Sequence, residues 1–180
     1  NPAMAPIKDL YDEGKVAVIH GTGYPVPNRS HFRSMDIWHT AEPTKVGNEG
    51  WLGNTINQMY PQHDNVVAAV NFGAGLPRAL VAHGAPVASV TDLKTYGLMN
   101  HMGESQQRNE ALQAFRDMYS QAIGSGPVMD YLSQTGLDAL KGADILGTVL
   151  DKYSSDVEYS DNSFSKAMKG AAQVLQAEIG

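Results

Sequence analysis

Two short, almost continuously apolar runs constrain the fold of this chain more than any other feature. The first occupies residues 15–20 and follows Gly14; the second occupies residues 66–72 and precedes Gly73. Both are rich in valine, and runs of this kind are typical of strands buried on both faces of a parallel sheet. Parallel strands need long crossover connections, which are usually helical. The runs therefore predict an α/β fold.

Apolar side chains at helical spacing surround these runs. They predict helices at residues 2–13, 31–40 and 51–60, with Gly14 in the position of a C-terminal glycine cap and Ser30 as an N-terminal cap. Two further short strands are expected at residues 79–81 and 87–90, as a hairpin around residues 84–86.

The second half of the chain is predicted to be rich in helices. Helical spacing begins at Glu104, is broken at residues 124–127 by Gly-Ser-Gly-Pro, and resumes over residues 128–153. Residues 154–163 are polar and are interpreted as a loop. The turn at residues 160–163 then caps a last amphipathic helix.

Composition excludes several classes of protein. The chain has 180 residues, enough for one domain or two at most, and contains no cysteine. Disulfide scaffolds, thiolate zinc sites, iron–sulfur clusters and cysteine nucleophiles are thereby ruled out. A net charge of −6 without a run of Lys and Arg argues against nucleic-acid binding. No apolar stretch approaches the roughly 20 residues of a membrane span.

The segment from residue 23 to residue 36 carries the densest set of functional side chains. It connects the first predicted strand to the helix expected at 31–40, where ligands bind in open α/β sheets. Free N–H groups at the start of that helix would favour an anion. Arg29 and Arg33 can each form forked hydrogen bonds to a phosphate or sulfate. Ser30 places a hydroxyl at the helix start, as a nucleophile would.

Simpler interpretations of the same residues stay open. A serine before a helix most often only caps it, and both arginines can be solvated surface cations. His31 can be an ordinary residue of the first helical turn. The six histidines form no His-x-x-x-His or Glu-x-x-His pair, so the sequence contains no local metal-binding motif.

Residues 23–41 read Gly-Tyr-Pro-Val-Pro-Asn-Arg-Ser-His-Phe-Arg-Ser-Met-Asp-Ile-Trp-His-Thr-Ala, and residues 50–53 read Gly-Trp-Leu-Gly. Together with residues 1–20, these motifs resemble the exported bacterial "domain of unknown function 1501" family. The resemblance is specific over residues 1–53 and looser up to the end of the chain, where Tyr-Ser-Asp-Asn-Ser-Phe at 159–164 is also similar to that family.

The resemblance implies a three-layer α/β/α fold of the alkaline phosphatase and sulfatase superfamily. Its members hydrolyse phosphate or sulfate esters at a metal site, with a nucleophile at a helix N-terminus. By resemblance, Ser30 is the candidate nucleophile and Arg29 the candidate anion clamp. His31 belongs to the same catalytic motif, and Asn28 and Arg33 are further anion-binding candidates.

The resemblance also implies an internal part of a longer protein. Family members carry a Gly-Gly-Asn-Asp-Gly-like segment before this region and Glu-Phe-Gly-Arg and Thr-Asp-His-Gly segments after it, and none of these occurs in the 180 residues. Those segments would supply the ligands of zinc, calcium or magnesium ions, so we expect this chain to hold no metal alone. The missing N- and C-terminal segments would be its partners.

We therefore expect residues 1–180 to form one partial alkaline-phosphatase-like domain, with an α/β part at 1–103 and a helical part at 104–180. The strand at 15–20 should lie at a sheet edge or pair with a segment outside this chain. Export by a twin-arginine signal, typical of the family, implies a periplasmic or extracellular location.

Three functions are compatible with the sequence. The first is a fragment of a metal-dependent hydrolase of small anionic esters, inactive by itself. The second is a non-catalytic binding or structural module of the cell envelope. A lectin-like or assembly role for residues 62–103, which are rich in Gly and Asn, is the third and has no motif to support it.

Overall fold

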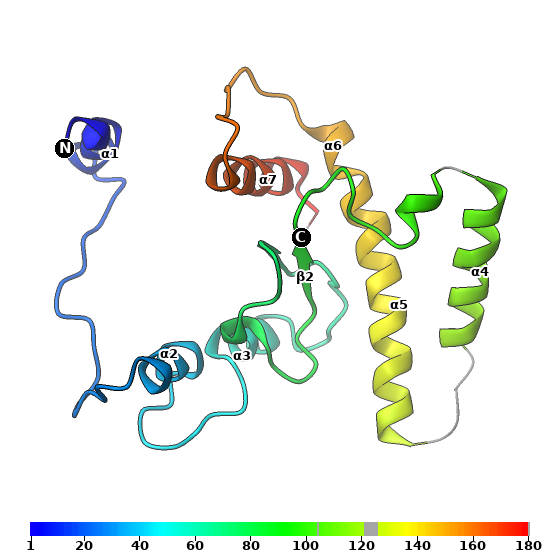
Figure 1. Ribbon diagram of the computed structural model, residues 1–180, viewed down its shortest axis with the longest axis horizontal. Helices are drawn as coiled ribbons and strands as arrows, with labels where there is room; N and C mark the ends of the chain where they lie inside the picture. Colours follow the sequence, from blue (N-terminus) through cyan, green and yellow to red (C-terminus); the bar gives the residue numbers. More distant parts are fainter. Residues whose placement is uncertain (104, 121–125, 180) are drawn as a thin grey trace.

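The computed structural model describes residues 1–103, 105–120 and 126–179, and it is rich in helices around one small sheet (Figure 1). The structure is 52% helical and its two strands are parallel, which agrees with an α/β fold in general. The elements, in chain order, are η1 (Pro2–Met4), α1 (Ala5–Asp12), α2 (His31–Thr40), α3 (Trp51–Met59), β1 (Ala69–Phe72), η2 (Arg78–Leu80), β2 (Val87–Val90), η3 (Asn100–Met102), α4 (Gln106–Ser120), α5 (Pro127–Gly147), α6 (Val149–Lys152) and α7 (Ser163–Ala177).

The sheet pairs β1 with β2 in parallel. Ala69 lies opposite Val87 and Phe72 lies opposite Val90. The predicted strands at 66–72 and 87–90 are thus confirmed, the first in shortened form. The predicted hairpin is wrong: residues 78–80 form the 3-10 helix η2 where a strand was expected. Two parallel strands cannot be joined by a tight turn, so the chain needs the whole connection at 73–86 to return to the start of the sheet.

The core lies where the sheet meets α5, α6 and the end of α7. Val90, Leu146 and Val149 are fully buried there, and the remaining buried members of the cluster are Val66, Val67, Ala88, Leu93 and Ala177. Helix α7 approaches β1 very closely, because a Cβ on Gly170 would overlap the ring of Phe72. Glycine at position 170 therefore sets the distance between this helix and the sheet.

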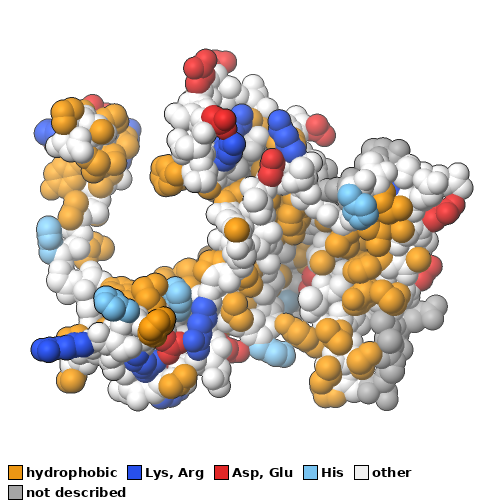
Figure 2. Space-filling model, in the orientation of Figure 1, with side chains coloured by type: hydrophobic (Ala, Val, Ile, Leu, Met, Phe, Trp, Pro, Cys, Tyr) orange, Lys and Arg blue, Asp and Glu red, His pale blue; other side chains and the backbone are white. Residues whose placement is uncertain are grey.

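The predicted strand at residues 15–20 is wrong. This segment has no regular structure and pairs with no strand of the described residues, and the side chains of Val18 and Ile19 are 61% and 81% exposed. An apolar run becomes a strand only where a neighbouring strand satisfies its backbone groups. With α1, it forms an arm that leaves the body of the molecule (Figure 1), and Figure 2 shows hydrophobic side chains over that arm.

The predicted helices agree with the structure. Gly14 has a φ of +73° directly after α1, as a C-terminal glycine cap requires, and Asn162 caps α7 by accepting from the Ser165 N–H at 2.9 Å. Of the predicted break at 124–127, residues 124 and 125 lie outside the described residues, and α5 begins at Pro127. Within the described ranges, no helix is long and apolar enough to cross a membrane.

Candidate functional site

The loop before α2 is held by hydrogen bonds around Tyr24. The Tyr24 hydroxyl accepts from the Asn28 backbone N–H at 3.1 Å and lies 3.3 Å from Ser34 Oγ, which in turn donates to the Asn28 carbonyl at 2.7 Å. The hydrogen bond with Ser34, followed by that from Asn28, lowers the pKa of Tyr24 below its ordinary value. These contacts join the loop to the first turn of the helix, and residues 28–31 form the exposed tip of the loop.

Ser30 caps α2. Its Oγ accepts from the Arg33 N–H at 3.4 Å, and its own N–H donates to Asn28 Oδ1 at 2.8 Å. Ser30 has extended backbone angles, as an N-terminal cap does, so the predicted capping position is confirmed. The hydroxyl remains exposed to solvent at the helix N-terminus. Its role as a nucleophile stays a prediction.

The side chain of Arg33 forms an ion pair within α2 and hydrogen bonds to the following loop. Its guanidinium forms an ion pair with Asp36 and donates to the carbonyls of Glu42 at 2.9 Å and Lys45 at 2.6 Å. The Arg33 side chain is 21% exposed and that of Asp36 13% exposed, so the pair is largely screened from water. Binding an anion through Arg33 would require it to leave these partners, and that role also stays a prediction.

Arg29 and His31 lie on either side of Ser30 and are exposed. Neither forms a hydrogen bond or ion pair through its side chain with the described part of the chain. Two large apolar side chains beside them, Val26 and Phe32, are 92% and 90% exposed. Of the sequence candidates, Asn28, Arg29, Ser30 and His31 therefore lie at one exposed tip. The guanidinium of Arg33 instead pairs with Asp36.

The described residues do not fit a divalent metal ion. Over the described ranges, no group of three or more His, Asp or Glu side chains is placed to hold one. Asp36 is the one carboxylate of α2, and its two oxygens face Arg33 and Arg78. We therefore derive no metal-dependent step from these residues.

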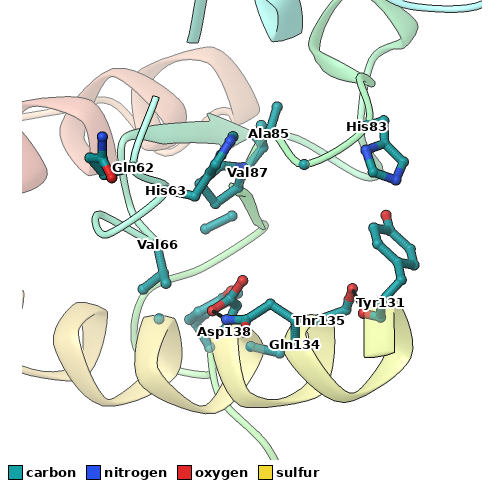
Figure 3. Close-up of a pocket in the computed structure, with 16 residues that line it drawn as sticks. Gln62, His63, Val66, His83, Ala85, Val87, Tyr131, Gln134, Thr135 and Asp138 are labelled. Carbon is teal, nitrogen blue, oxygen red and sulfur yellow. Dashed lines mark hydrogen bonds between the residues drawn. The ribbon is translucent and has the colours of Figure 1, made fainter. Parts of the chain in front are cut away.

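A second candidate site is a cavity of about 600 Å³ between α5 and the chain that leads into β2. Figure 3 shows His63 and His83 on one side of it, and Tyr131, Gln134, Thr135 and Asp138 along the α5 side. The rings of His83 and Tyr131 are stacked, with centroids 5.3 Å apart and an interplanar angle of 22°.

Sequence reasoning missed this cavity. A signal was present, because Tyr131, Gln134 and Asp138 recur at helical spacing and therefore lie on one face of the helix. The two histidines that face this stripe are 20 residues apart and have no motif in common. Only the fold brings them to the same hollow.

Comparison of the chain with models of known families, with curated proteins and with solved structures finds no match. The class of the molecule therefore follows from the structure alone: a helix-rich α/β protein with a parallel two-stranded sheet.

Proposed function

We propose that this chain is the nucleophile-bearing part of an exported hydrolase of phosphate or sulfate esters with an alkaline-phosphatase-like fold. The observation that carries the proposal is the exposed tip at the start of α2. There the hydroxyl of Ser30 lies at a helix N-terminus, between the exposed side chains of Arg29 and His31. Helix N-termini favour anions through their free N–H groups and dipole, and arginine matches the oxygens of a phosphate or sulfate.

In this proposal, Arg29 binds the anionic group of the ester and Ser30 attacks it. Asn28 holds Ser30 in place for this attack. Its side chain accepts a hydrogen bond from the Ser30 N–H, and its own backbone N–H donates to the Tyr24 hydroxyl. The metal ligands, and with them the activation of the serine, come from sequence outside these residues. The chain alone is then expected to be inactive.

The surroundings of the sheet support the proposal that further sequence completes the fold. Parallel sheets normally have both faces covered, yet all four residues of β1 are only half-buried. The apolar segment 15–20 has the composition of a buried strand but lies in solvent. Further strands and helices of a three-layer fold would cover both regions.

The test uses the longer protein that contains this chain. It should hydrolyse p-nitrophenyl phosphate or p-nitrophenyl sulfate in the presence of zinc, magnesium or calcium. Ser30→Ala should reduce kcat about a thousand-fold or more, as the loss of a nucleophile does. Ser105→Ala is the matched control, since Ser105 Oγ also accepts the N–H of an arginine three residues later, at 3.2 Å. Absence of turnover with every metal, or equal activity of both variants, would overturn the proposal.

A non-catalytic binding module of the cell envelope is the second candidate. Two contacts favour it: Ser30 already serves as a helix cap, and Arg33 is occupied by Asp36 and loop carbonyls. Under this proposal, Ser30→Ala lowers only the stability of α2, by about 1 kcal/mol. Thermal unfolding of the Ser30 and Ser105 variants, beside their activities, distinguishes the two candidates.

A further inference from the structure

We infer that the cavity between α5 and the chain leading into β2 binds a neutral carbohydrate of one or two sugar units. This site is separate from the tip of α2 and does not depend on the proposed hydrolase. The inference rests on the size of the cavity, the hydrogen-bonding groups that line it and the charge of that lining.

The size of the cavity fits a small ligand. Its volume of about 600 Å³ lies within the range of roughly 300–1,000 Å³ that small-molecule sites occupy. Its lining includes Val66 and Ala88, which are both buried in the core cluster. Helix α5 forms one wall, and its Leu146 is fully buried in the same cluster. The helix that lines the cavity is therefore also part of the core.

The lining offers donors and acceptors together. The amides of Gln62 and Gln134, the imidazoles of His63 and His83 and the Tyr131 hydroxyl can each provide both. Every hydroxyl of a sugar also donates and accepts, so a polyol can satisfy such a lining without leaving groups unpaired. Ligands that carry only acceptors or only donors would satisfy half of it.

The stacked pair of His83 and Tyr131 adds a flat surface at one end of the cavity. Tyr131 is 48% exposed, so part of its ring is open to contact. The C–H face of a pyranose ring can pack on such a surface, because aromatic rings present a negative face to the weakly positive hydrogens. The cavity thus combines one aromatic contact with several polar ones.

The charge of the lining disfavours an anionic ligand. Among the described residues of the lining there is one carboxylate, Asp138, and neither lysine nor arginine. An anion would meet Asp138 without a compensating guanidinium or ammonium group. One oxygen of Asp138 already accepts from Gln134 Nε2 at 2.7 Å, which fixes the carboxylate and leaves its second oxygen for a ligand hydroxyl. A carboxylate held in this way is suited to accept from a sugar hydroxyl.

The experiment measures binding to the 180-residue chain by saturation-transfer NMR and by titration calorimetry. The neutral probes are methyl α-glucoside, methyl α-galactoside, methyl α-mannoside and maltose; glucose 6-phosphate is the anionic comparison. At least one neutral probe should bind, at least about tenfold more tightly than glucose 6-phosphate, a difference of about 1.4 kcal/mol.

Matched variants then locate the site. Tyr131→Ala should weaken binding at least about tenfold, whereas Leu132→Ala should not change it; both side chains are 48% exposed and neighbours on α5, but only Tyr131 lines the cavity. Asp138→Asn should weaken binding similarly, and Asp144→Asn, on the same helix outside this cavity, should not. Circular dichroism confirms that each variant is folded.

Three outcomes would overturn the inference: no neutral probe binds, glucose 6-phosphate binds as tightly, or the Tyr131 and Leu132 variants behave alike. Turnover of aryl esters is not a readout here. Failure of this inference therefore leaves the proposed hydrolase untouched, and failure of the hydrolase leaves this inference untouched.

Discussion

Arg78 of η2 forms an ion pair with Asp36 of α2, and this pair fastens the connection after β1 to the helix that carries the candidate site. Asp36 also binds Arg33 through its other oxygen, so one carboxylate lies between two guanidinium groups. Arg78 additionally donates to the Gly47 carbonyl at 2.5 Å. The position of α2 relative to η2 therefore depends on a charged cluster whose carboxylate is largely buried.

Replacing Asp36 should destabilise the protein. In Asp36→Asn, the two guanidinium groups would face each other without the carboxylate that neutralises them. The cost should be about 1–3 kcal/mol, less than for a fully buried pair because the Arg78 side chain is 44% exposed. Urea unfolding measures the change. The control is Asp161→Asn, which removes the ion pair between Asp161 and Lys166. These side chains are 89% and 67% exposed, so this variant should leave the midpoint unchanged. Equal midpoints for both variants would show that the cluster is not stabilising.

The sequence predicts those elements whose signals are local. Helical spacing, Ser30 and Asn162 as caps and Gly14 as a stop depend on neighbours within a few residues, and each agrees with the structure. A strand at residues 15–20 would need a pairing partner that is distant in the sequence. The composition of the segment does not reveal whether such a partner is present. Sequence reasoning could therefore recognise a segment fit for a strand, but not whether the described chain pairs it.

The candidate sites also differ in whether their residues are neighbours in the sequence. The tip at residues 28–31 is contiguous in sequence, so the pattern places it at the start of a helix correctly. The engagement of Arg33 was not predictable, because its partners include the carbonyls of Glu42 and Lys45 in an irregular loop. The cavity was missed because His83 and Tyr131, which lie on opposite sides of it, are 48 residues apart in the sequence. They meet only in the folded chain.

Two glycines of α5 should respond oppositely to alanine. A Cβ on Gly136 would overlap the ring of Tyr119 on α4, so Gly136→Ala should destabilise by about 1–3 kcal/mol through overpacking. Gly147 has no heavy atom within 4 Å of an added Cβ, and Gly147→Ala should stabilise by about 0.5–1 kcal/mol because alanine favours helix. Thermal unfolding of both variants measures the difference. A loss in both would contradict the open surroundings of Gly147.

Removal of residues 1–20 should hardly affect the stability of the remaining chain. No residue from 1 to 30 is buried, and the apolar side chains of α1, such as Ile7 and Leu10, are exposed. The midpoint of thermal unfolding should therefore shift by less than about 2 °C. Hydrogen exchange of the intact chain should also be fast at the amides of residues 16–20, which have no ladder partner among the described residues. A fall of more than about 4 °C would show that the arm packs on the body.

Stability should decrease at high pH partly through Tyr96. Burial against the core cluster raises the pKa of Tyr96 above its ordinary value of 10.0. Between the unfolded and the folded pKa, the unfolded chain has lost the phenol proton while the folded chain still holds it, so rising pH favours unfolding. Tyr96→Phe removes this proton, and its unfolding free energy should decline less steeply above pH 10 than that of the parent chain. Tyr11→Phe, at an exposed position of α1, should keep the parent slope. Identical slopes for Tyr96→Phe and the parent would show that Tyr96 ionises equally well in both states.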